Sequence, residues 1–287
     1  MSFGLGDLVV SLPAVQALID GGEETRLVAR SPAQAELARR IGGLSGCVAA
    51  DDVGDTDGDG RFVDLRDHPL QRDHWWGSPA FERAHPGLLI NDIISRISAD
   101  FGIVVDITRP TALTSHPRPE LGSSVVFVVD TDGATKRWPA SRWLALASEL
   151  GRRGFDVRAL GRDDRGGADG IETVCAPTPG DVVDVLSAAR AVVGVDTGPT
   201  HIAVQQGTPT VTICRRGNVY LRPWPHTRAV TGEPCDPACV AMDQKHAYND
   251  RVDLRGFEWQ PRRCPVDGRC LGAIEPEHVL HALDQVL

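Results

Sequence analysis

Short apolar runs alternate with helix-like stretches along much of this chain, and Gly, Pro and Asp residues separate them. This alternation is typical of a parallel sheet whose strands are joined by crossover helices, so we predict the α/β fold class. The chain has 287 residues, of which 41% are hydrophobic and 24% charged. These values fit one large domain or two ordinary ones, and they exclude a disordered or disulfide-framed protein.

The second half has the clearer pattern, and a connecting segment precedes it. Residues 108–124 contain three prolines and no helical or strand period, which indicates a connection between two halves. We place the domain boundary near residue 118, which gives domains 1–118 and 119–287. In the second domain, strands are predicted at 125–130, 156–160, 191–195 and 209–213, and helices after Pro139, at 181–189 and from Pro199.

The first half begins with a glycine-containing turn. Gly4 and Gly6 permit a tight turn that leads into an amphipathic helix, and Asp7 stands at the start of that helix. Only three residues precede the turn, so the strand expected before it is a stub or is missing. Pro13 would cost about 3 kcal/mol in a helix interior unless it lies in the first turn, which leaves the start of the helix open.

The strongest local signal lies where an apolar strand ends at Asp196 and a Thr-Gly-Pro turn begins a helix. The first backbone N–H groups of a helix have no partner inside it, and with the helix dipole they favour a bound phosphate. Thr197, Gly198, Thr200 and His201 would surround this anion. The alternative is that Thr197 only caps the helix and that His201 is a surface or core residue with satisfied hydrogen bonds.

A second signal is the basic loop that contains Lys136 and Arg137. The chain has only two lysines, Lys136 and Lys245, and Lys136 follows a buried strand. Ligands of open α/β sheets bind at the carboxyl ends of the strands, so Lys136 is a candidate for neutralising a diphosphate. The alternative is a solvated loop with Trp138 packed beneath it.

Four segments occur in a recognisable order: GDLVVSLPAVQAL near the start, TKRWPASRW in the middle, VGVDTGPTHIAVQQGTPTV later and CPVDGRCLGAIEPEHVLHAL at the end. Together they resemble glycosyltransferase family 9, the ADP-heptose lipopolysaccharide heptosyltransferases and their relatives. The resemblance implies a GT-B fold, in which two Rossmann-like domains face each other across a cleft. It also implies inverting, metal-independent transfer of heptose or a related sugar from an NDP-sugar, expected to be ADP-linked, to a hydroxyl acceptor.

The resemblance also assigns roles to single residues. It makes Asp7 the general base for the acceptor hydroxyl, with Gly6 on the acceptor side. Asp164 is the nearest candidate for an acidic residue that contacts the ribose. The full set expected to bind the nucleotide sugar and its diphosphate is Lys136, Asp196, Thr197, Gly198, Thr200, His201 and Asp164.

A cluster of aromatic and basic residues in the first half is the candidate acceptor-binding wall. Trp faces stack on sugars, and Arg pairs with anionic groups. The alternative is that one Trp fills the core and that the charges are solvated. The cluster consists of Arg66, His68, Arg72, His74, Trp75 and Trp76.

Two metal-site patterns are weaker than their alternatives, and no cofactor is predicted. Asp55, Asp57 and Asp59 begin a calcium-loop pattern, but Arg66 occupies the position of its final Glu, and 61–65 is predicted to be a strand. Buried thiols are a better interpretation than a zinc site for the last four cysteines, Cys235, Cys239, Cys264 and Cys270.

Charge and hydropathy limit the partners. The net charge of −9 argues against a nucleic-acid binder, which needs clustered Lys and Arg. No apolar stretch is long enough to span a membrane and no secretion signal is evident, so a cytoplasmic protein with at most peripheral membrane contact is expected. The expected partners are an NDP-sugar donor and a small-molecule or glycolipid acceptor. Two other functions stay open: a GT-B sugar-nucleotide epimerase and a non-catalytic sugar-nucleotide-binding protein.

Overall fold

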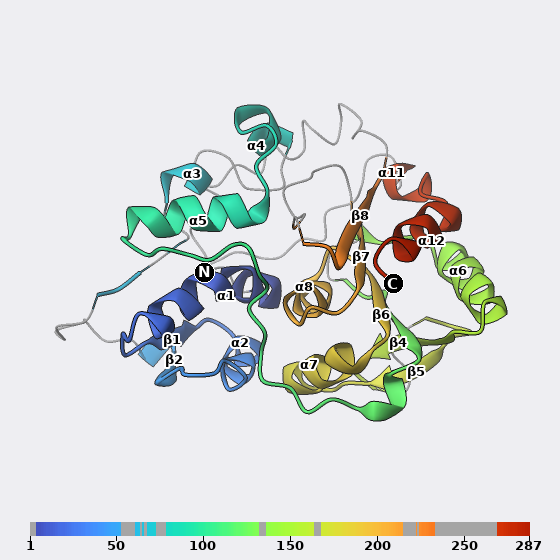
Figure 1. Cartoon of the computed structure of the whole chain (residues 1–287), viewed down its shortest axis with the longest axis horizontal. Helices are drawn as coiled ribbons and strands as arrows, with labels where there is room; N and C mark the ends of the chain where they lie inside the picture. Colours follow the sequence, from blue (N-terminus) through green and yellow to red (C-terminus); the bar gives the residue numbers. More distant parts are fainter. Residues whose placement is uncertain are drawn as a thin grey trace.

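The computed structural model describes residues 4–52, 61–63, 65, 68–72, 79–131, 136–163, 168–214, 222, 224–232 and 269–287. These residues form an N-terminal and a C-terminal α/β unit that lie side by side (Figure 1). The α/β class predicted from the sequence is therefore confirmed. No helix in the described ranges combines the length and the apolar character needed to cross a membrane.

The C-terminal unit contains a six-stranded parallel sheet in the order β5-β4-β3-β6-β7-β8. Its strands are β3 (Ser124–Val128), β4 (Asp156–Gly161), β5 (Glu172–Cys175), β6 (Ala191–Val195), β7 (Thr210–Cys214) and β8 (Thr227–Thr231). Its helices are α6 (Ala140–Arg152), α7 (Pro179–Ala188), α8 (Gly198–Gln205), α11 (Arg269–Gly272) and α12 (Pro276–Asp284), with a 3-10 turn at η3 (Pro119–Leu121). The four strands predicted from the sequence are confirmed; β5 and β8 were not predicted.

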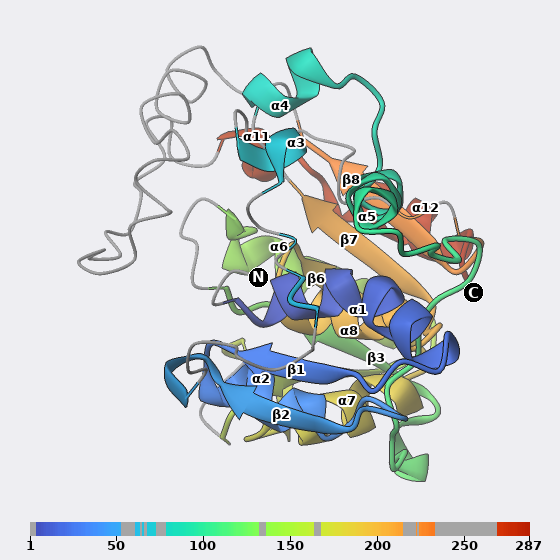
Figure 2. The same cartoon turned by 90° about the vertical axis from the view of Figure 1, so that its left-hand side faces the viewer.

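Helices cover both faces of this sheet because its strands are apolar on both sides. Along β3, Val126 and Val128 join the core under α7 and α8, while Val125 and Phe127 join the core under α6 and α12. Such continuous apolar strands are typical of parallel sheets that are buried between two helical layers. Figure 2 shows α7 and α8 on the face that the N-terminal unit covers.

The N-terminal unit has a two-stranded parallel sheet and several helices. Its elements are α1 (Leu5–Asp20), β1 (Arg26–Ala29), α2 (Pro32–Ala38), β2 (Gly46–Ala49), η1 (Ala50–Asp52), α3 (Pro69–Arg72), α4 (Pro79–Ala84) and α5 (Ile90–Asp100). The strand predicted at 61–65 is wrong for the residues described there, which are not in a strand. Arg61 instead donates to the Phe101 carbonyl and pairs with Glu23, and Leu65 packs against α5.

The start of the chain differs from the predicted turn. Gly4 is the N-cap of α1, and Leu5, Gly6 and Asp7 form the first helical turn. Asp7 is therefore inside the helix and is not its cap. Pro13 also lies within α1, well beyond the first turn, which answers the question that the sequence left open.

The two units share a hydrophobic core. Leu8, Leu12 and Leu37 of the N-terminal unit belong to the same buried cluster as Val183 and Ile202 of the C-terminal unit. In Figures 1 and 2, α1 lies along α8, and α2 lies beside α7. The other side of α1 packs under α5. The relative position of the units is therefore set by packing as well as by the chain connection.

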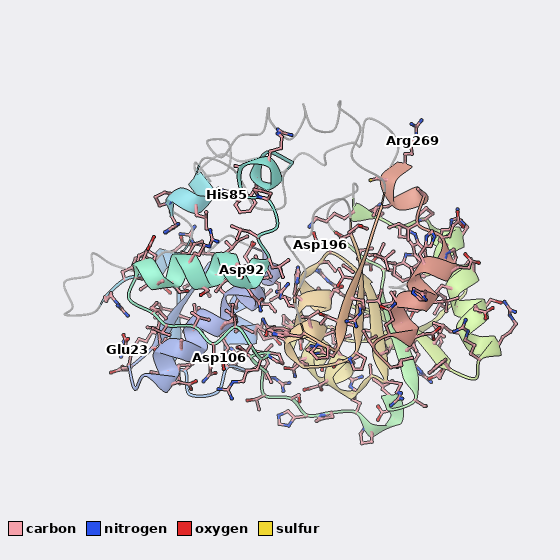
Figure 3. The ribbon with its side chains drawn as sticks, turned by 45° about the horizontal axis from the view of Figure 1, so that its top comes forward. Glu23, His85, Asp92, Asp106, Asp196 and Arg269 are labelled. Atoms are coloured by element: carbon pink, nitrogen blue, oxygen red, sulfur yellow. The ribbon has the colours of Figure 1, made fainter. Side chains whose placement is uncertain are left out.

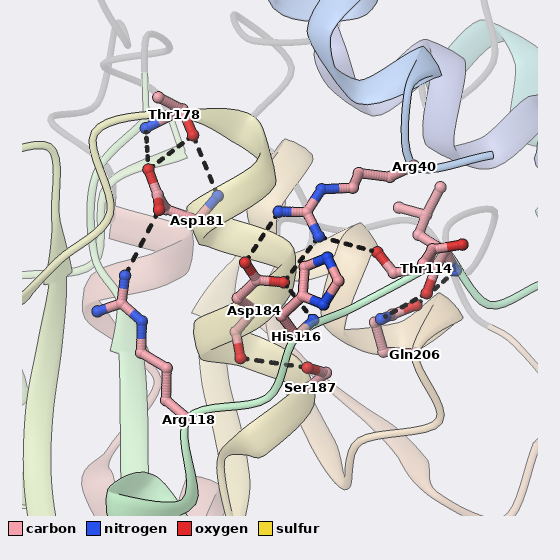
Figure 4. A network of polar contacts seen from close by, with 10 residues as sticks. Arg40, Thr114, His116, Arg118, Thr178, Asp181, Asp184, Ser187 and Gln206 are labelled. Carbon is pink, nitrogen blue, oxygen red and sulfur yellow. Dashed lines mark hydrogen bonds and ion pairs between the residues drawn. The ribbon is translucent and has the colours of Figure 1, made fainter.

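The connection between the units, residues 103–118, contains no helix or strand and is fixed by an ion pair (Figure 4). Arg40, just after α2, donates both terminal nitrogens to the Asp184 carboxylate of α7, at 3.0 and 2.9 Å. The connection joins this pair, because the His116 N–H also donates to Asp184, at 2.7 Å, and Thr114 exchanges hydrogen bonds with Arg40. The paired side chains are only 19% and 12% exposed.

We predict that Arg40→Met lowers the free energy of unfolding by about 2 to 3 kcal/mol, because it leaves a largely buried carboxylate without its cation. Urea unfolding measures this. The control is Arg26→Met, since Arg26 pairs with Glu24 where both side chains are about two-thirds exposed, and it should change stability by no more than about 0.5 kcal/mol. Equal effects of the two variants would contradict the prediction.

Candidate functional site

The candidate site lies at the carboxyl ends of β3 and β6, the central neighbours of the large sheet. From β3 the chain continues outward through β4 and β5, and from β6 it continues in the opposite direction through β7 and β8. Ligands of open α/β sheets bind at such a switch of direction. Lys136 follows β3 and Asp196 follows β6, so the topology brings these two distant residues together.

Lys136 and Asp196 form a close ion pair. The lysine Nζ donates to Asp196 Oδ2 at 2.7 Å and to the Asp196 carbonyl at 3.1 Å. Burial by itself would raise the pKa of the Asp196 carboxyl, but the Lys136 charge and the His201 hydrogen bond outweigh it and hold that pKa far below its usual value. Asp196 is thus ionised, and the Lys136 side chain remains 33% exposed at the edge of the site.

His201 completes this charged group from the first turns of α8. Its Nε2 lies 3.1 Å from Asp196 Oδ1, and the side chain is 7% exposed. Burial lowers the pKa of His201 below its ordinary value, and the charges of Arg222 and Lys136 act in the same direction, against the raising effect of Asp196. The imidazole is therefore neutral at pH 7, and the interpretation of His201 as a surface residue is excluded.

The side chains of the strand-to-helix turn after Asp196 differ in their hydrogen bonds. Thr197 is the N-cap of α8, but its side chain makes no capping hydrogen bond, so the interpretation of Thr197 as only a cap is not supported. Thr200 is completely buried and donates its hydroxyl to the Val195 carbonyl at 2.7 Å. The Thr200 hydroxyl is therefore used inside the protein, which leaves the backbone N–H groups of Gly198 and Thr200 as candidate donors to an anion at this turn.

The first turn of α1 lies directly against the first turn of α8. A Cβ on Gly198 would lie 3.1 Å from the Gly6 nitrogen, and a Cβ on Gly6 would lie 3.5 Å from the Gly198 Cα. His201 Cδ2 is also close, 3.4 Å from the same position on Gly6. Glycine at both places thus allows the two backbones to meet, and it puts the turn that contains Asp7 beside His201.

The Asp7 carboxylate turns back toward the start of its helix. Asp7 Oδ2 lies 2.9 Å from the position that a Cβ on Gly4 would take. A carboxylate in this place is stabilised by the positive end of the helix dipole. Because α1 and α8 meet at their starts, both helix N-termini are close to the Lys136–Asp196–His201 group. Figure 3 shows Asp196 in the region between the N-terminal helices and the large sheet.

Two buried tryptophans fix the loop that carries Lys136. Trp138 is 3% exposed and makes an edge-to-face contact with Trp143. Its indole N–H donates to the Ile274 carbonyl at 3.0 Å. Arg142 and Glu275 form an ion pair between the same two regions. Trp138 is thus packed beneath the loop, as one interpretation of the sequence held, and this packing holds Lys136 at the sheet edge.

Several predicted site residues lie outside what the structure describes. For Arg72 only the helical backbone of α3 is given, and His68, which is described, pairs with Asp100 and accepts from the Leu70 N–H. These contacts tie His68 to α5 and to α3. The others outside the described ranges are Asp164, Arg66, His74, Trp75 and Trp76, together with Asp55, Asp57, Asp59, Cys235, Cys239 and Cys264.

Two further points concern possible metal ligands and a residue that the sequence prediction missed. Within the described ranges, no three His, Cys, Asp or Glu side chains are grouped so that they could hold a metal ion. Cys270 is a buried thiol. The sequence prediction missed Arg222, which is 6% exposed and contributes to the low pKa of His201. Its position in the Arg-Pro-Trp-Pro stretch before an edge strand gave no periodic signal.

The sequence of this chain is similar to glycosyltransferases of one family. Residues 106–245, slightly less than half of the chain, match the model of glycosyltransferase family 9 (heptosyltransferase). Lipopolysaccharide heptosyltransferase 1 of Pseudomonas aeruginosa is 29% identical over 228 residues, which are 72% of this chain and 62% of that relative. The match therefore spans less than two thirds of the curated relative's length.

Solved structures are similar over nearly the whole chain. A family 9 glycosyl transferase from Veillonella parvula has a TM-score of 0.62 at 14% identity, with 100% of this chain and 95% of that one covered. E. coli heptosyltransferase WaaC with ADP has a TM-score of 0.58 at 14% identity, with 99% and 97% covered. E. coli ADP-heptose lps heptosyltransferase II has a TM-score of 0.59 at 15% identity, with 100% and 96% covered. These matches establish the GT-B fold.

We predict that His201 makes stability depend on pH. Its pKa is lower in the folded protein than the ordinary value of 6.5, so between the folded pKa and about 6.5 the unfolded chain binds more protons. Stability should therefore fall as pH decreases below about 6.5, by at most about 1.4 kcal/mol per pH unit from this one group.

Urea unfolding from pH 5 to 8 measures this effect. His201→Gln should flatten the fall below pH 6.5, because Gln does not titrate. The control is His281→Gln at an exposed histidine, which should keep the parent profile. A His201→Gln profile that matches the parent protein would show that His201 is protonated equally in both states.

Proposed function

We propose that this chain, a glycosyltransferase family 9-like protein with a GT-B fold, transfers heptose or a related sugar from an ADP-linked donor to a hydroxyl acceptor. The observation that carries the proposal is the meeting of the α1 and α8 N-termini beside the Lys136–Asp196 pair. This arrangement puts a carboxylate and a diphosphate-binding edge next to each other. Such a pairing suits a reaction in which one group takes a proton while another stabilises a leaving anion.

The donor side of the proposal rests on charge and access. The Lys136 side chain is held by Asp196 yet partly exposed, so we expect it to contact a diphosphate without leaving its partner. The Gly198 and Thr200 N–H groups at the start of α8 add donors for the same anion. The matched E. coli WaaC structures, with ADP and with ADP-2-deoxy-2-fluoro heptose, support ADP as the nucleotide.

The proposed reaction is a single displacement at the anomeric carbon of the donor sugar. The acceptor oxygen attacks the anomeric carbon, and the bond from that carbon to the diphosphate oxygen breaks with inversion. The proton of the acceptor hydroxyl moves to the Asp7 carboxylate. The negative charge that develops on the departing nucleoside diphosphate is stabilised by Lys136 and by the helix N–H groups, which allows metal-independent transfer.

The acceptor side of the proposal belongs to the N-terminal unit. We keep Gly6, Arg66, Arg72, His74, Trp75 and Trp76 as its candidate residues and 118 as the boundary between the two domains. Gly6 lies in the first turn of α1, at the contact with α8. A small-molecule or glycolipid acceptor would then approach Asp7 from the side of α1.

We predict that Lys136→Ala weakens ADP binding and lowers turnover by about 10²-fold, the scale for losing one preorganised donor to a developing charge. Isothermal titration calorimetry with a panel of nucleoside diphosphates measures the affinity, and ADP should bind the parent protein most tightly. The control is Arg137→Ala, since Arg137 is the exposed cation next in sequence and should retain affinity. Equal losses of ADP affinity in the two variants would show that Lys136 contributes only as one of the positive charges of the loop, and would contradict the prediction.

We predict that Asp7→Asn keeps the affinity for ADP while turnover falls by about 10²- to 10⁴-fold, the range for losing a general base. Asn keeps the size of Asp but accepts a proton far less readily. Steady-state kinetics with an ADP-sugar, together with calorimetry, separates the two effects. Asp20→Asn, at the exposed far end of α1, is the matched control and should keep native rates. Near-native turnover of Asp7→Asn would assign the base to another residue.

A further inference from the structure

We propose that Gln205, at the end of α8, is a positioning residue that holds α1 against α8 and so keeps Asp7 beside the Lys136–Asp196–His201 group. The inference rests on the proposed function for its effect on turnover, but its structural part stands on contacts alone. Gln205 is 1% exposed and belongs to neither the donor-binding nor the proton-accepting residues. It lies at the opposite end of α8 from the candidate site.

Pro13 creates the acceptor that Gln205 uses. In a regular helix the N–H of residue 13 would donate to the carbonyl of Val9, but proline has no N–H to give. The Val9 carbonyl therefore lacks its usual partner within α1. Gln205 Nε2 reaches it from α8, at 3.5 Å. The proline that would be costly in an isolated helix thus makes a contact point for the neighbouring unit.

The other end of the same amide binds the connection between the units. The Thr111 N–H donates to Gln205 Oε1 at 2.8 Å. This bond also fixes the orientation of the amide, because a backbone N–H needs the oxygen and leaves the nitrogen for the Val9 carbonyl. One buried side chain therefore joins α1, the connection and α8.

The contact with Val9 acts close to the proposed base. Val9 is two residues after Asp7 on α1, and the Ser11 hydroxyl donates to the Asp7 carbonyl, which stiffens the same turn. The first turn of α1 meets α8 at the close approach of Gly6 and Gly198. A shift of α1 along α8 would move Asp7 relative to Lys136, and misplacement by about 1 Å can cost about 10²-fold in rate.

Gln206 offers a matched control in the next position. Its side chain accepts from the Leu113 N–H at 2.7 Å and donates to the Leu113 carbonyl at 3.1 Å. Figure 4 shows Gln206 beside this connecting segment. Gln206 is thus bonded to the connection, as Gln205 is, but both of these side-chain bonds go to Leu113 and neither reaches α1.

The first experiment compares Gln205→Leu with Gln206→Leu in the full chain, by hydrogen–deuterium exchange of the α1 amides. We expect exchange over 5–12 to rise by about 10-fold or more in Gln205→Leu and to stay within about 2-fold of the parent protein in Gln206→Leu. Equal exchange in the two variants would overturn the proposal. This measurement needs neither donor nor acceptor, so it decides the positioning role even where the proposed function fails.

The second experiment separates positioning from stability by adding Pro13→Ala to Gln205→Leu. The introduced alanine supplies the N–H that the Val9 carbonyl lacks, so thermal stability should rise above that of Gln205→Leu. The Thr111 N–H stays without its acceptor, and the link to α8 stays broken. We expect turnover with an ADP-sugar to remain about 10-fold or more below that of Pro13→Ala, with ADP affinity unchanged. Recovery of turnover together with stability would show that Gln205 is merely structural and would overturn the proposal.

Discussion

The close packing of α1 on α8 holds the two units together and brings the parts of the candidate site to one place. Gly6 and Gly198 allow the two backbones to meet, and the buried side chains of both helices belong to one core. This contact joins the first turn of the chain to a turn that follows the sixth strand. The helix dipoles and first-turn N–H groups of both N-termini therefore act on the same region, which favours negatively charged groups there.

Within the Lys136–Asp196–His201 group, the negative charge of Asp196 is offset by the positive charge of Lys136. Asp196 is ionised, Lys136 is its cation, and His201 is neutral because it is buried near other positive charges. A carboxylate this deeply buried is stable because the Lys136 ammonium and the His201 imidazole both bind it. Lys136 is the partly exposed member, so it is the one through which the group can meet a diphosphate.

The sequence predicted the central strands well and the edge strands poorly. β3, β6 and β7 are fully or almost fully buried, and their continuous apolar runs are strong signals. β5 and β8 form the two edges of the sheet, where Glu172 and Thr231 are exposed and the pattern is mixed. The helix after Asp196 and the loop of Lys136 were likewise predicted, because both follow strong strands.

Local signals in the sequence were enough to show where the central strands end and which charged residues follow them, since those signals lie within a few residues of each other. Three features needed the folded chain: that Asp7 lies inside its helix, that Pro13 is tolerated there, and that Gln205 reaches the Val9 carbonyl 196 residues away. From the sequence alone, Pro13 leaves the start of the helix open. In the folded chain, α8 supplies a donor for the carbonyl that Pro13 leaves without its helical partner, because a buried carbonyl needs a partner wherever in the chain that partner comes from.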